Sequence, residues 1–200
     1  MRYAVLGTGV VGTTIAAKLV SQGNEARLGS RTAGEGKVTY AEAARWAEVV
    51  VNATNGAGSL EALRAAGAAA LAGKVLIDIA NPLDFSKGMP PTLFVKDDDS
   101  LAERIQREFP EARVVKTLNT MSCAIMVDPS RLKEEHDVFV SGNDKAAKDF
   151  VAELLRGWGW RNIRDLGDIT TARGTEMLLP IWLRLWGAIG HADYNFHIAM

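Results

Sequence analysis

Apolar, β-branched runs alternate along this 200-residue chain with stretches that are rich in alanine. Runs such as EVVVNAT, residues 48–54, are typical of buried strands, and the alanine-rich stretches between them are typical of helices. Strands and helices that alternate in this way predict an α/β protein. We therefore expect a doubly wound, mostly parallel sheet that is followed by a short apolar helical extension.

Glycine, proline and changes of hydrophobic period mark where the expected elements end. The expected strands are Tyr3–Leu6, Glu25–Gly29, Glu48–Thr54, Lys74–Pro82, the start of Arg113–Met121, His136–Gly142 and Asn162–Leu166. The expected helices are Thr13–Gln22, Tyr40–Ala47, Ser59–Leu71, Leu101–Phe109 and Lys145–Trp158. Residues 31–40 contain two glycines and leave room only for a short or irregular crossover, and residues 81–100 form a long, proline-containing excursion.

The segment Thr175–Trp186 is apolar almost all round a helix. A helix of this kind is buried on several sides. We expect it to pack against a second copy of the chain in a homodimer, with closure of its own protomer's core as the alternative. Its apolar residues are Met177, Leu178, Leu179, Ile181, Trp182, Leu183, Leu185 and Trp186.

The first strand and helix are joined by the glycine-rich turn VLGTGVVG. In a dinucleotide-binding turn of the Rossmann type, Gly7 permits the tight turn, Gly9 lets the backbone approach the pyrophosphate, and Gly12 allows close packing of helix on strand. The pyrophosphate then lies on free N–H groups at the helix N-terminus. The position between a strand and a helix favours this interpretation over a plain tight turn. The expected site residues are Gly7, Thr8, Gly9, Val10, Val11 and Gly12.

The end of the second expected strand, LGSRT, indicates which dinucleotide binds. Sites for NAD usually place an acidic residue here, about 20 residues past the glycines, to bind the ribose 2′-hydroxyl. This chain has Ser30, Arg31 and Thr32 instead. A guanidinium can pair with a 2′-phosphate, and the two hydroxyls can donate hydrogen bonds. The pattern favours NADP over NAD, with a polar surface turn as the alternative.

Two further loops follow strands that are expected to end at the same edge of the sheet. Doubly wound sheets bind ligands outside the carboxyl ends of their strands. We expect a ribose and a nicotinamide to lie over the loops NATNGAGS (52–59) and ANPLD (80–84), although asparagine and glycine are also ordinary turn formers. The candidate binding residues in these loops are Ala53, Thr54, Asn55, Asn81 and Pro82.

Composition and charge narrow the class of protein. The chain is 48% hydrophobic and 24% charged, with a formal net charge of -1, which gives no reason to expect a nucleic acid or an anionic membrane as partner. The single cysteine, Cys123, cannot form an internal disulfide, so we expect a reducing, cytoplasmic location. The brief apolar run at the N-terminus does not predict a signal peptide.

The sequence lacks an evident proton donor for catalysis. No tyrosine has a lysine four residues further on, and there is no cysteine cluster for zinc. We interpret His191 and His197 as packing or interface residues, His136 as solvated, and Cys123 as a small buried apolar residue. Hydride transfer between two stacked cofactors needs no proton donor, because the protein supplies only orientation and exclusion of water.

Four motifs resemble the coenzyme F420-dependent NADP oxidoreductases and the related cytosolic domain of the STEAP metalloreductases. The motifs are VLGTGVVG (5–12), LGSRT (28–32), ANPLD (80–84) and VVKTLNTM (114–121), and the likeness extends through the tail ARGTEMLLPIWLRLWGAIG (172–190). The resemblance implies NADP(H) bound by the glycine turn and by residues 30–32. It also implies an isoalloxazine-like ring, from F420 or a flavin, that lies against the nicotinamide. The residues implied beside that ring are Asn81, Pro82, Leu83, Asn119, Thr120 and Met121.

Three functions are compatible with these features. The first is an NADP(H)-dependent oxidoreductase that exchanges hydride with a deazaflavin or flavin-like acceptor. The second is an NADPH-dependent reductase of another small substrate, and the third is a non-catalytic sensor of NADP(H). We expect residues 1–168 to form an NADP-binding Rossmann domain, and residues 169–200 to cover its cleft or to form the dimer contact.

Overall fold

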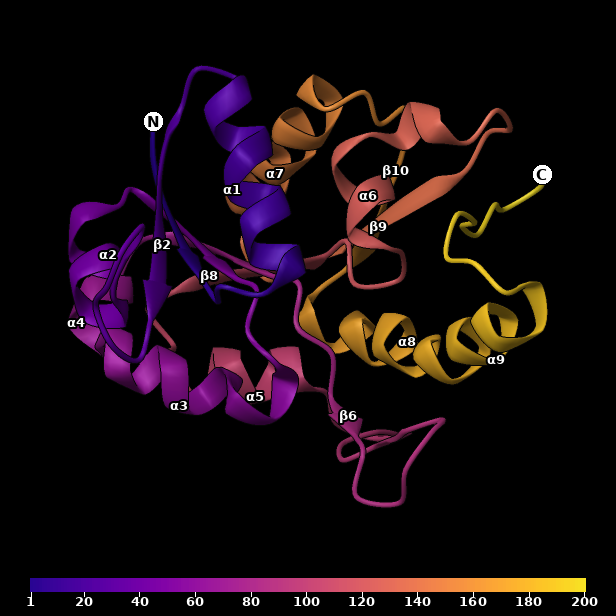
Figure 1. Ribbon diagram of the computed structural model, residues 1–200, viewed down its shortest axis with the longest axis horizontal. Coiled ribbons are helices and arrows are strands. Elements are labelled where there is room, and N and C mark those ends of the chain that lie inside the picture. Colours follow the sequence, from indigo (N-terminus) through magenta and orange to yellow (C-terminus); the bar gives the residue numbers. More distant parts are fainter.

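The computed structural model describes all residues of the chain, 1–200, around one eight-stranded sheet with helices on both faces (Figure 1). The strands, in their order across the sheet, are β3 (Lys37–Thr39), β2 (Glu25–Ser30), β1 (Arg2–Leu6), β4 (Val49–Asn52), β5 (Val75–Asp78), β8 (Arg113–Thr117), β9 (Asp137–Ser141) and β10 (Asn162–Gly167). All neighbouring strands are parallel except β8 and β9, which are antiparallel. The six strands from β3 across to β8 follow one another in the Rossmann order. The predicted mostly parallel, doubly wound sheet is therefore confirmed.

Helices cover the sheet on both sides, and each layer encloses its own core (Figure 1). One face carries α1 (Val10–Ser21), α6 (Cys123–Val127) and α7 (Lys145–Gly157). The other carries α2 (Tyr40–Trp46), α3 (Gly56–Ala66), α4 (Ala68–Leu71) and α5 (Leu101–Glu108). The two cores contain 21 and 20 buried residues, and this equal covering explains why the central strands are apolar on both faces.

Local capping decides several boundaries that the hydrophobic pattern places a few residues away. The side chain of Asn55 accepts a hydrogen bond from the amide of Ala57, so α3 begins at Gly56 and not at Ser59. Gly67, at φ +94°, then separates α3 from α4, where a single helix is predicted. Residues 31–40 contain no helix until their last residue, as expected, and supply the short edge strand β3.

The excursion at residues 81–100 contains a small antiparallel pair, β6 (Leu83–Asp84) and β7 (Thr92–Leu93), and projects from the body of the molecule (Figure 1). Two 3-10 helices, η1 (Pro129–Arg131) and η2 (Ile169–Thr171), precede β9 and the C-terminal helices. The predicted apolar C-terminal helix is divided into α8 (Ala172–Met177) and α9 (Leu179–Ile189). No helix has the length and apolar character required to cross a membrane.

The C-terminal tail returns to cover the start of β9. The amide of Asp137 donates to the carbonyl of Phe196 at 2.9 Å, and its carboxylate accepts from the amide of Ile198 at 2.7 Å. The prediction that His136 is solvated is therefore wrong. Its ring is buried beneath the tail, with Nε2 3.0 Å from the carbonyl oxygen of Pro129 and Nδ1 2.9 Å from the side chain of Asn195. Local sequence cannot reveal cover that comes from residues about 60 positions away.

Candidate functional site

The turn from β1 to α1 brings the backbone too close to its neighbours for side chains at two of its glycines. A methyl group on Gly7, which has φ +116°, would lie 2.4 Å from the carbonyl oxygen of Ala53. A methyl group on Gly12 would lie 2.1 Å from the carbonyl oxygen of Gly7. At Gly9, by contrast, nothing lies within 4 Å of the added carbon. Gly7 and Gly12 are thus required by the fold, whereas Gly9 exposes bare backbone to open space.

The N-terminus of α1, just after this turn, has the features of an anion-binding site. No side chain caps it, and no acidic residue lies in its first turn. Val10, its first residue, is 73% exposed, whereas Val11 packs against the first core and Gly12 is buried. The unpaired N–H groups and the helix dipole at such an end attract negative charge.

A hollow of about 470 Å³ opens beside this turn. Its position matches the topological switch point, because the chain leaves β1 for β2 on one side and later places β4 on the other. Seven predicted binding residues line the hollow together, namely Gly7, Thr8, Gly9, Arg31, Ala53, Thr54 and Asn55. The tertiary structure therefore gathers residues from three separate loops at one place.

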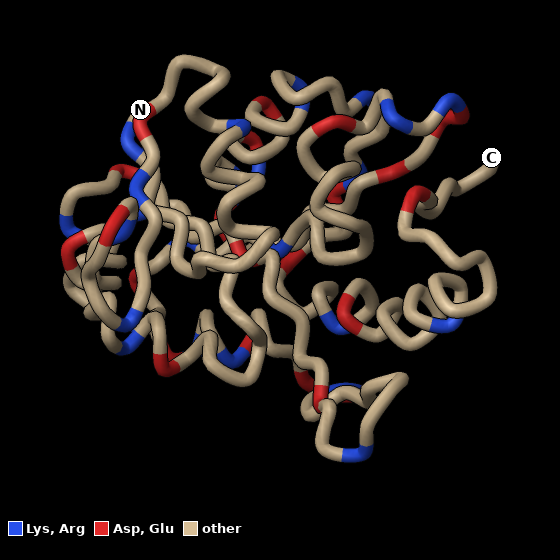
Figure 2. The backbone as a smooth tube through the Cα atoms, viewed as in Figure 1, with Lys and Arg blue, Asp and Glu red and all other residues tan.

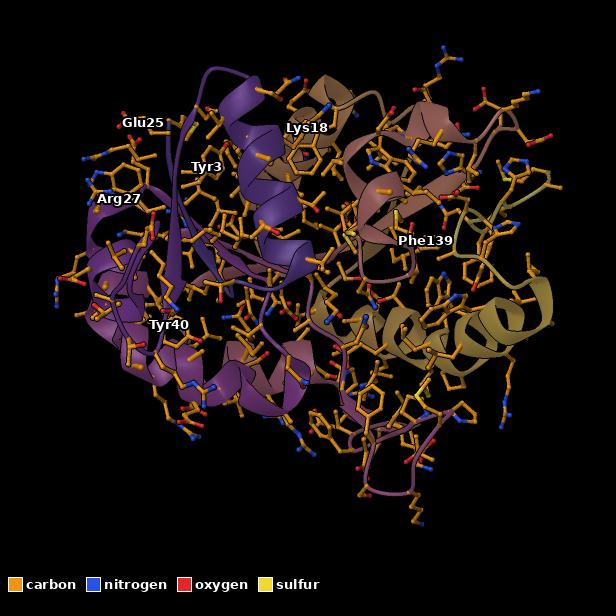
Figure 3. The ribbon with its side chains drawn as sticks, viewed as in Figure 1. Tyr3, Lys18, Glu25, Arg27, Tyr40 and Phe139 are labelled. Carbon is orange, nitrogen blue, oxygen red and sulfur yellow. The ribbon has the colours of Figure 1, made fainter.

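Sequence reasoning missed five residues of the same hollow, namely Tyr40, Gly58, Glu61, Ala62 and Ala65. Residues 58, 62 and 65 have the spacing of one helix face, which is the signal that could have indicated them. Tyr40 begins α2 beside the carboxyl end of β2 (Figure 3). Its aromatic side chain lines the same hollow as Arg31.

The three polar residues after β2 have different environments. Arg31 lines the hollow and forms no ion pair within the chain. Ser30 is buried, and its hydroxyl donates to the backbone carbonyl of Thr32. Neither Ser30 nor Thr32 lines the hollow. Of the three, only Arg31 both lines the hollow and has a guanidinium without an ion pair.

The predicted residues after β5 and β8 meet one another beside this hollow. Asn81 donates to the carbonyl of Asn119 at 2.9 Å, and Asn119 donates back to the Asn81 side chain at 3.0 Å and to the carbonyl of Thr175 at 3.1 Å. A methyl group on Gly56 would lie 1.9 Å from the carbonyl oxygen of Asn81. The loop after β5 therefore packs directly on the start of α3 and is tied to α8.

The side chains of the turn after β8 offer little free surface in a single chain. Asn119, Thr120 and Met121 are each at most 5% exposed. Leu118, just before them, has φ +62°, a conformation that non-glycine residues adopt at a cost of about 1–3 kcal/mol and that clusters at functional sites. Pro82 and Leu83 belong to the base of the β6–β7 excursion, where the Pro82 carbonyl accepts from the amide of Phe94 at 2.9 Å.

A buried ion cluster lies behind the carboxyl ends of β5 and β8, and sequence reasoning missed it. The ammonium group of Lys116 lies 2.9 Å from a carboxylate oxygen of Asp78 and 2.9 Å from one of Glu176. None of the three side chains is more than 2% exposed. The available signal was a charged residue inside an apolar strand run, in VLID and again in RVVK.

The cluster holds two carboxylates and one ammonium, and the direction of the pKa shifts reflects this ratio. Burial alone would lower the pKa of Lys116, but the two carboxylates outweigh it and raise that pKa above its usual value. Burial raises the pKa of Glu176; Lys116 opposes this shift and Asp78 adds to it. The excess negative charge is partly offset by the amides of Leu101 and Ala102, which donate to Glu176 at 2.8 and 3.1 Å.

The chemistry available in the hollow is that of binding and orientation. The titratable side chains that line it are Arg31, Tyr40 and Glu61. Cys123 is half-buried at the start of α6, where it packs against the first core. No group of three His, Cys, Asp or Glu side chains is arranged to hold a metal ion. A free guanidinium, a helix N-terminus and exposed backbone together suit a phosphorylated nucleotide.

Similarity to known proteins identifies the family of the chain. Residues 2–82 match the family described as NADP oxidoreductase, coenzyme F420-dependent. A solved structure from Arthrobacter sp. FB24, provisionally described as an F420-dependent NADP reductase, is 55% identical, with a TM-score of 0.96 over 100% of both chains.

Two curated relatives are more distant in sequence. An F420-dependent NADP reductase of Methanothermobacter marburgensis is 29% identical over 92% of both chains. Metalloreductase STEAP3 of Rattus norvegicus is 29% identical over 90% of this chain, which spans only 38% of that longer protein. The resemblance expected from the four motifs is confirmed. The chain belongs to the family of F420-dependent NADP oxidoreductases.

Proposed function

We propose that the hollow binds NADP(H), with the pyrophosphate over Gly9 at the start of α1 and the 2′-phosphate at Arg31. The observation that carries this proposal is the exposed backbone at Gly9, next to an uncapped helix N-terminus, with an unpaired guanidinium in the same hollow. The residues fit the group, because each charged part of the nucleotide meets a donor. The hydrogen bond from Ser30 to the carbonyl of Thr32 supports the turn that carries Arg31. Residues 53–55, which also line the hollow, lie beside the ribose and the nicotinamide.

We further propose that the protein is an enzyme that exchanges a hydride between NADP(H) and a deazaflavin or flavin-like ring. NADPH supplies the hydride chemistry when bound, and the chain supplies binding, orientation and exclusion of water. The relatives described as F420-dependent NADP reductases support the choice of acceptor. The paired asparagines 81 and 119, with Pro82, Leu83, Thr120 and Met121, form the region against which we place the second ring.

The nucleotide assignment is tested by titration with NADPH and NADH while nicotinamide fluorescence is followed. Arg31→Ala removes one charged hydrogen bond, so NADPH binding should weaken by about 1.5–3 kcal/mol, with NADH almost unchanged. Arg27→Ala is the matched control, because Arg27 lies on β2, just before Arg31 in the chain (Figure 3), but stacks over Trp46 and does not line the hollow. Its guanidinium carbon lies 4.2 Å from the centre of the Trp46 ring. Equal affinity of the wild type for both nucleotides would refute the role of Arg31.

The acceptor is tested by mixing NADPH with a deazaflavin, FMN or FAD and recording absorbance of both rings. We expect turnover with the deazaflavin, and slower or no turnover with flavins. Tight NADPH binding without turnover of any ring would instead support a sensor. Turnover of another small substrate alone would support the general reductase. Either outcome would refute the deazaflavin assignment.

We also propose that the chain forms a homodimer through α9 in the cytoplasm. Ile181, Trp186 and Ile189 on this helix are 43–48% exposed in the single chain, although the pattern predicts burial on several sides. Arg184 is the only charged residue of α9, so the helix is almost uniformly uncharged in Figure 2, whereas both signs of charge are interspersed over the rest of the chain. Size-exclusion chromatography with light scattering tests the dimer, and a monomer at micromolar concentration would contradict it.

A further inference from the structure

The buried cluster of Lys116, Asp78 and Glu176 is more elaborate than stability requires. Burying ions is unfavourable unless pairing is complete, and well-packed apolar residues often hold a core equally well. Here the carboxylate of Asp78 is fully used. It accepts from Lys116 at 2.9 Å through one oxygen and from the side chain of Asn52 at 2.8 Å through the other. The second of these bonds leads away from the ions.

The bond from Asn52 to Asp78 determines how the Asn52 amide is oriented. Since its Nδ2 faces a carboxylate, which can only accept, its Oδ1 must face the opposite way. There Oδ1 accepts from the hydroxyl of Thr54 at 2.7 Å and lies 3.4 Å from the amide of the same residue. The hydroxyl of Thr54 also lies 2.9 Å from that of Ser59, at the start of α3. Because Asp78 can only accept, it determines which group donates and which accepts in the hydrogen bonds from Asn52 to Thr54.

The path ends at the wall of the nucleotide hollow. Thr54 lines the hollow, whereas Asn52, Asp78 and Lys116 are buried behind it and do not. Apolar packing could hold the strand ends together, but it cannot choose which way an amide faces. Buried polar networks do make that choice, because each group polarises and constrains the next.

We propose that Lys116 and Asp78 are positioning residues, which act through Asn52 to fix the Thr54 wall of the hollow in the orientation that receives NADPH. This inference rests on the proposed NADP(H) site and deepens it. Lys116 donates to one oxygen of Asp78, Asp78 orients Asn52 through the other, and Asn52 holds Thr54. Glu176 completes the pairing of Lys116 from α8. None of these buried groups needs to touch the nucleotide.

The test variant is Asp78→Asn. Asparagine has nearly the same size and shape as aspartate, and the change lies behind the hollow and not in its lining. The new amide should turn its carbonyl oxygen toward the ammonium of Lys116, because the opposite orientation would place an NH₂ group against that cation. Its NH₂ group then faces Nδ2 of Asn52, which is also a donor, so the Asn52 amide can no longer keep the orientation that holds Thr54. The change also removes one of the two carboxylates around Lys116, so the fold should tolerate it. We expect NADPH binding, followed by fluorescence, to weaken by about three- to tenfold, the range for one neutral hydrogen bond.

A double-mutant cycle with Thr54→Val separates positioning from general damage. Independent sites combine multiplicatively to within about twofold. We expect the double variant to bind NADPH no more weakly than the weaker single variant, because both changes break the same path. Asp137→Asn is the matched control, since Asp137 is equally buried, is paired with Arg164 and lies on β9 away from the hollow. It should lower the unfolding temperature and leave NADPH affinity within twofold.

Lys116→Met leaves the buried carboxylates of Asp78 and Glu176 without their cation, so this variant is prone to misfold. The proposal is therefore judged on Asp78→Asn. NADPH affinity within twofold of wild type in folded Asp78→Asn would overturn the positioning role and leave the nucleotide site standing. Multiplicative effects in the cycle would also overturn it. A wild type that binds no NADPH would refute the proposed function, and the positioning role would fall with it.

Discussion

Gly9→Ala should separate binding from folding at the glycine turn. Gly9 has φ −76° and ψ −177°, an extended conformation that alanine adopts freely, and its added carbon meets no atom within 4 Å. Alanine is a poorer N-cap than glycine by about 1 kcal/mol or less. The unfolded alanine variant has a lower conformational entropy than the unfolded wild type, which stabilises the folded variant by about 0.4–1 kcal/mol and offsets the weaker cap. The free energy of unfolding should therefore stay close to that of wild type.

Nucleotide binding should respond strongly to the same methyl group. It would occupy the open space through which the pyrophosphate reaches the amides at the start of α1. Loss of one charged hydrogen bond weakens binding by about 1.5–3 kcal/mol, which corresponds to roughly 10- to 150-fold in the dissociation constant. Gly12→Ala should behave differently, because its methyl group would lie 2.1 Å from the carbonyl oxygen of Gly7. That variant should lose about 3 kcal/mol of stability through overpacking.

The assay combines NADPH titration by fluorescence with urea unfolding of the ligand-free protein. Gly174→Ala serves as the control, because this exposed glycine of α8 also has open space around it and lies outside the hollow. It should leave NADPH affinity unchanged. A folded Gly9→Ala protein that binds NADPH within twofold of wild type would refute the placement of the pyrophosphate.

Three other predictions concern packing, pH and assembly. Gly56→Ala should lower the free energy of unfolding by about 2 kcal/mol, because its methyl group would lie 1.9 Å from the Asn81 carbonyl oxygen; an unchanged urea midpoint would contradict this. Burial alone would raise the pKa of Asp137, but the amide of Ile198 and the guanidinium of Arg164 outweigh it and lower that pKa below its usual 3.8. Its stabilising contribution, about 2 kcal/mol, is present above pH 3.8 and is lost as pH falls through the lowered pKa. The stability difference between wild type and Asp137→Asn should therefore shrink between pH 7 and pH 3, and a constant difference would disprove the linkage. Ile181→Lys, on the exposed face of α9, should give a monomer by light scattering with little change in unfolding temperature, and a persistent dimer would place the interface elsewhere.

The sequence was sufficient for the sheet, the glycine turn and the polar tip of β2. Hydrophobic period and glycine placement are local properties, and they report strands, helices and turns without knowledge of the rest of the chain. Gly7 and Gly12 could be assigned structural roles and Gly9 an open one, because the spacing of such turns is set by local backbone geometry. The polar tip is equally local, so Arg31 could be selected before its free guanidinium was located in the hollow.

Contacts between distant segments were decided only by the tertiary structure. The cover over His136 comes from Asn195, and the pairing of Lys116 comes from Asp78 and Glu176, so neither leaves a trace in the neighbouring residues. Tyr40 enters the hollow because β2 and the start of α2 meet at one sheet edge. Local sequence determines which conformation a segment prefers, whereas burial and charge pairing depend on which segments meet, and the folded chain alone determines that.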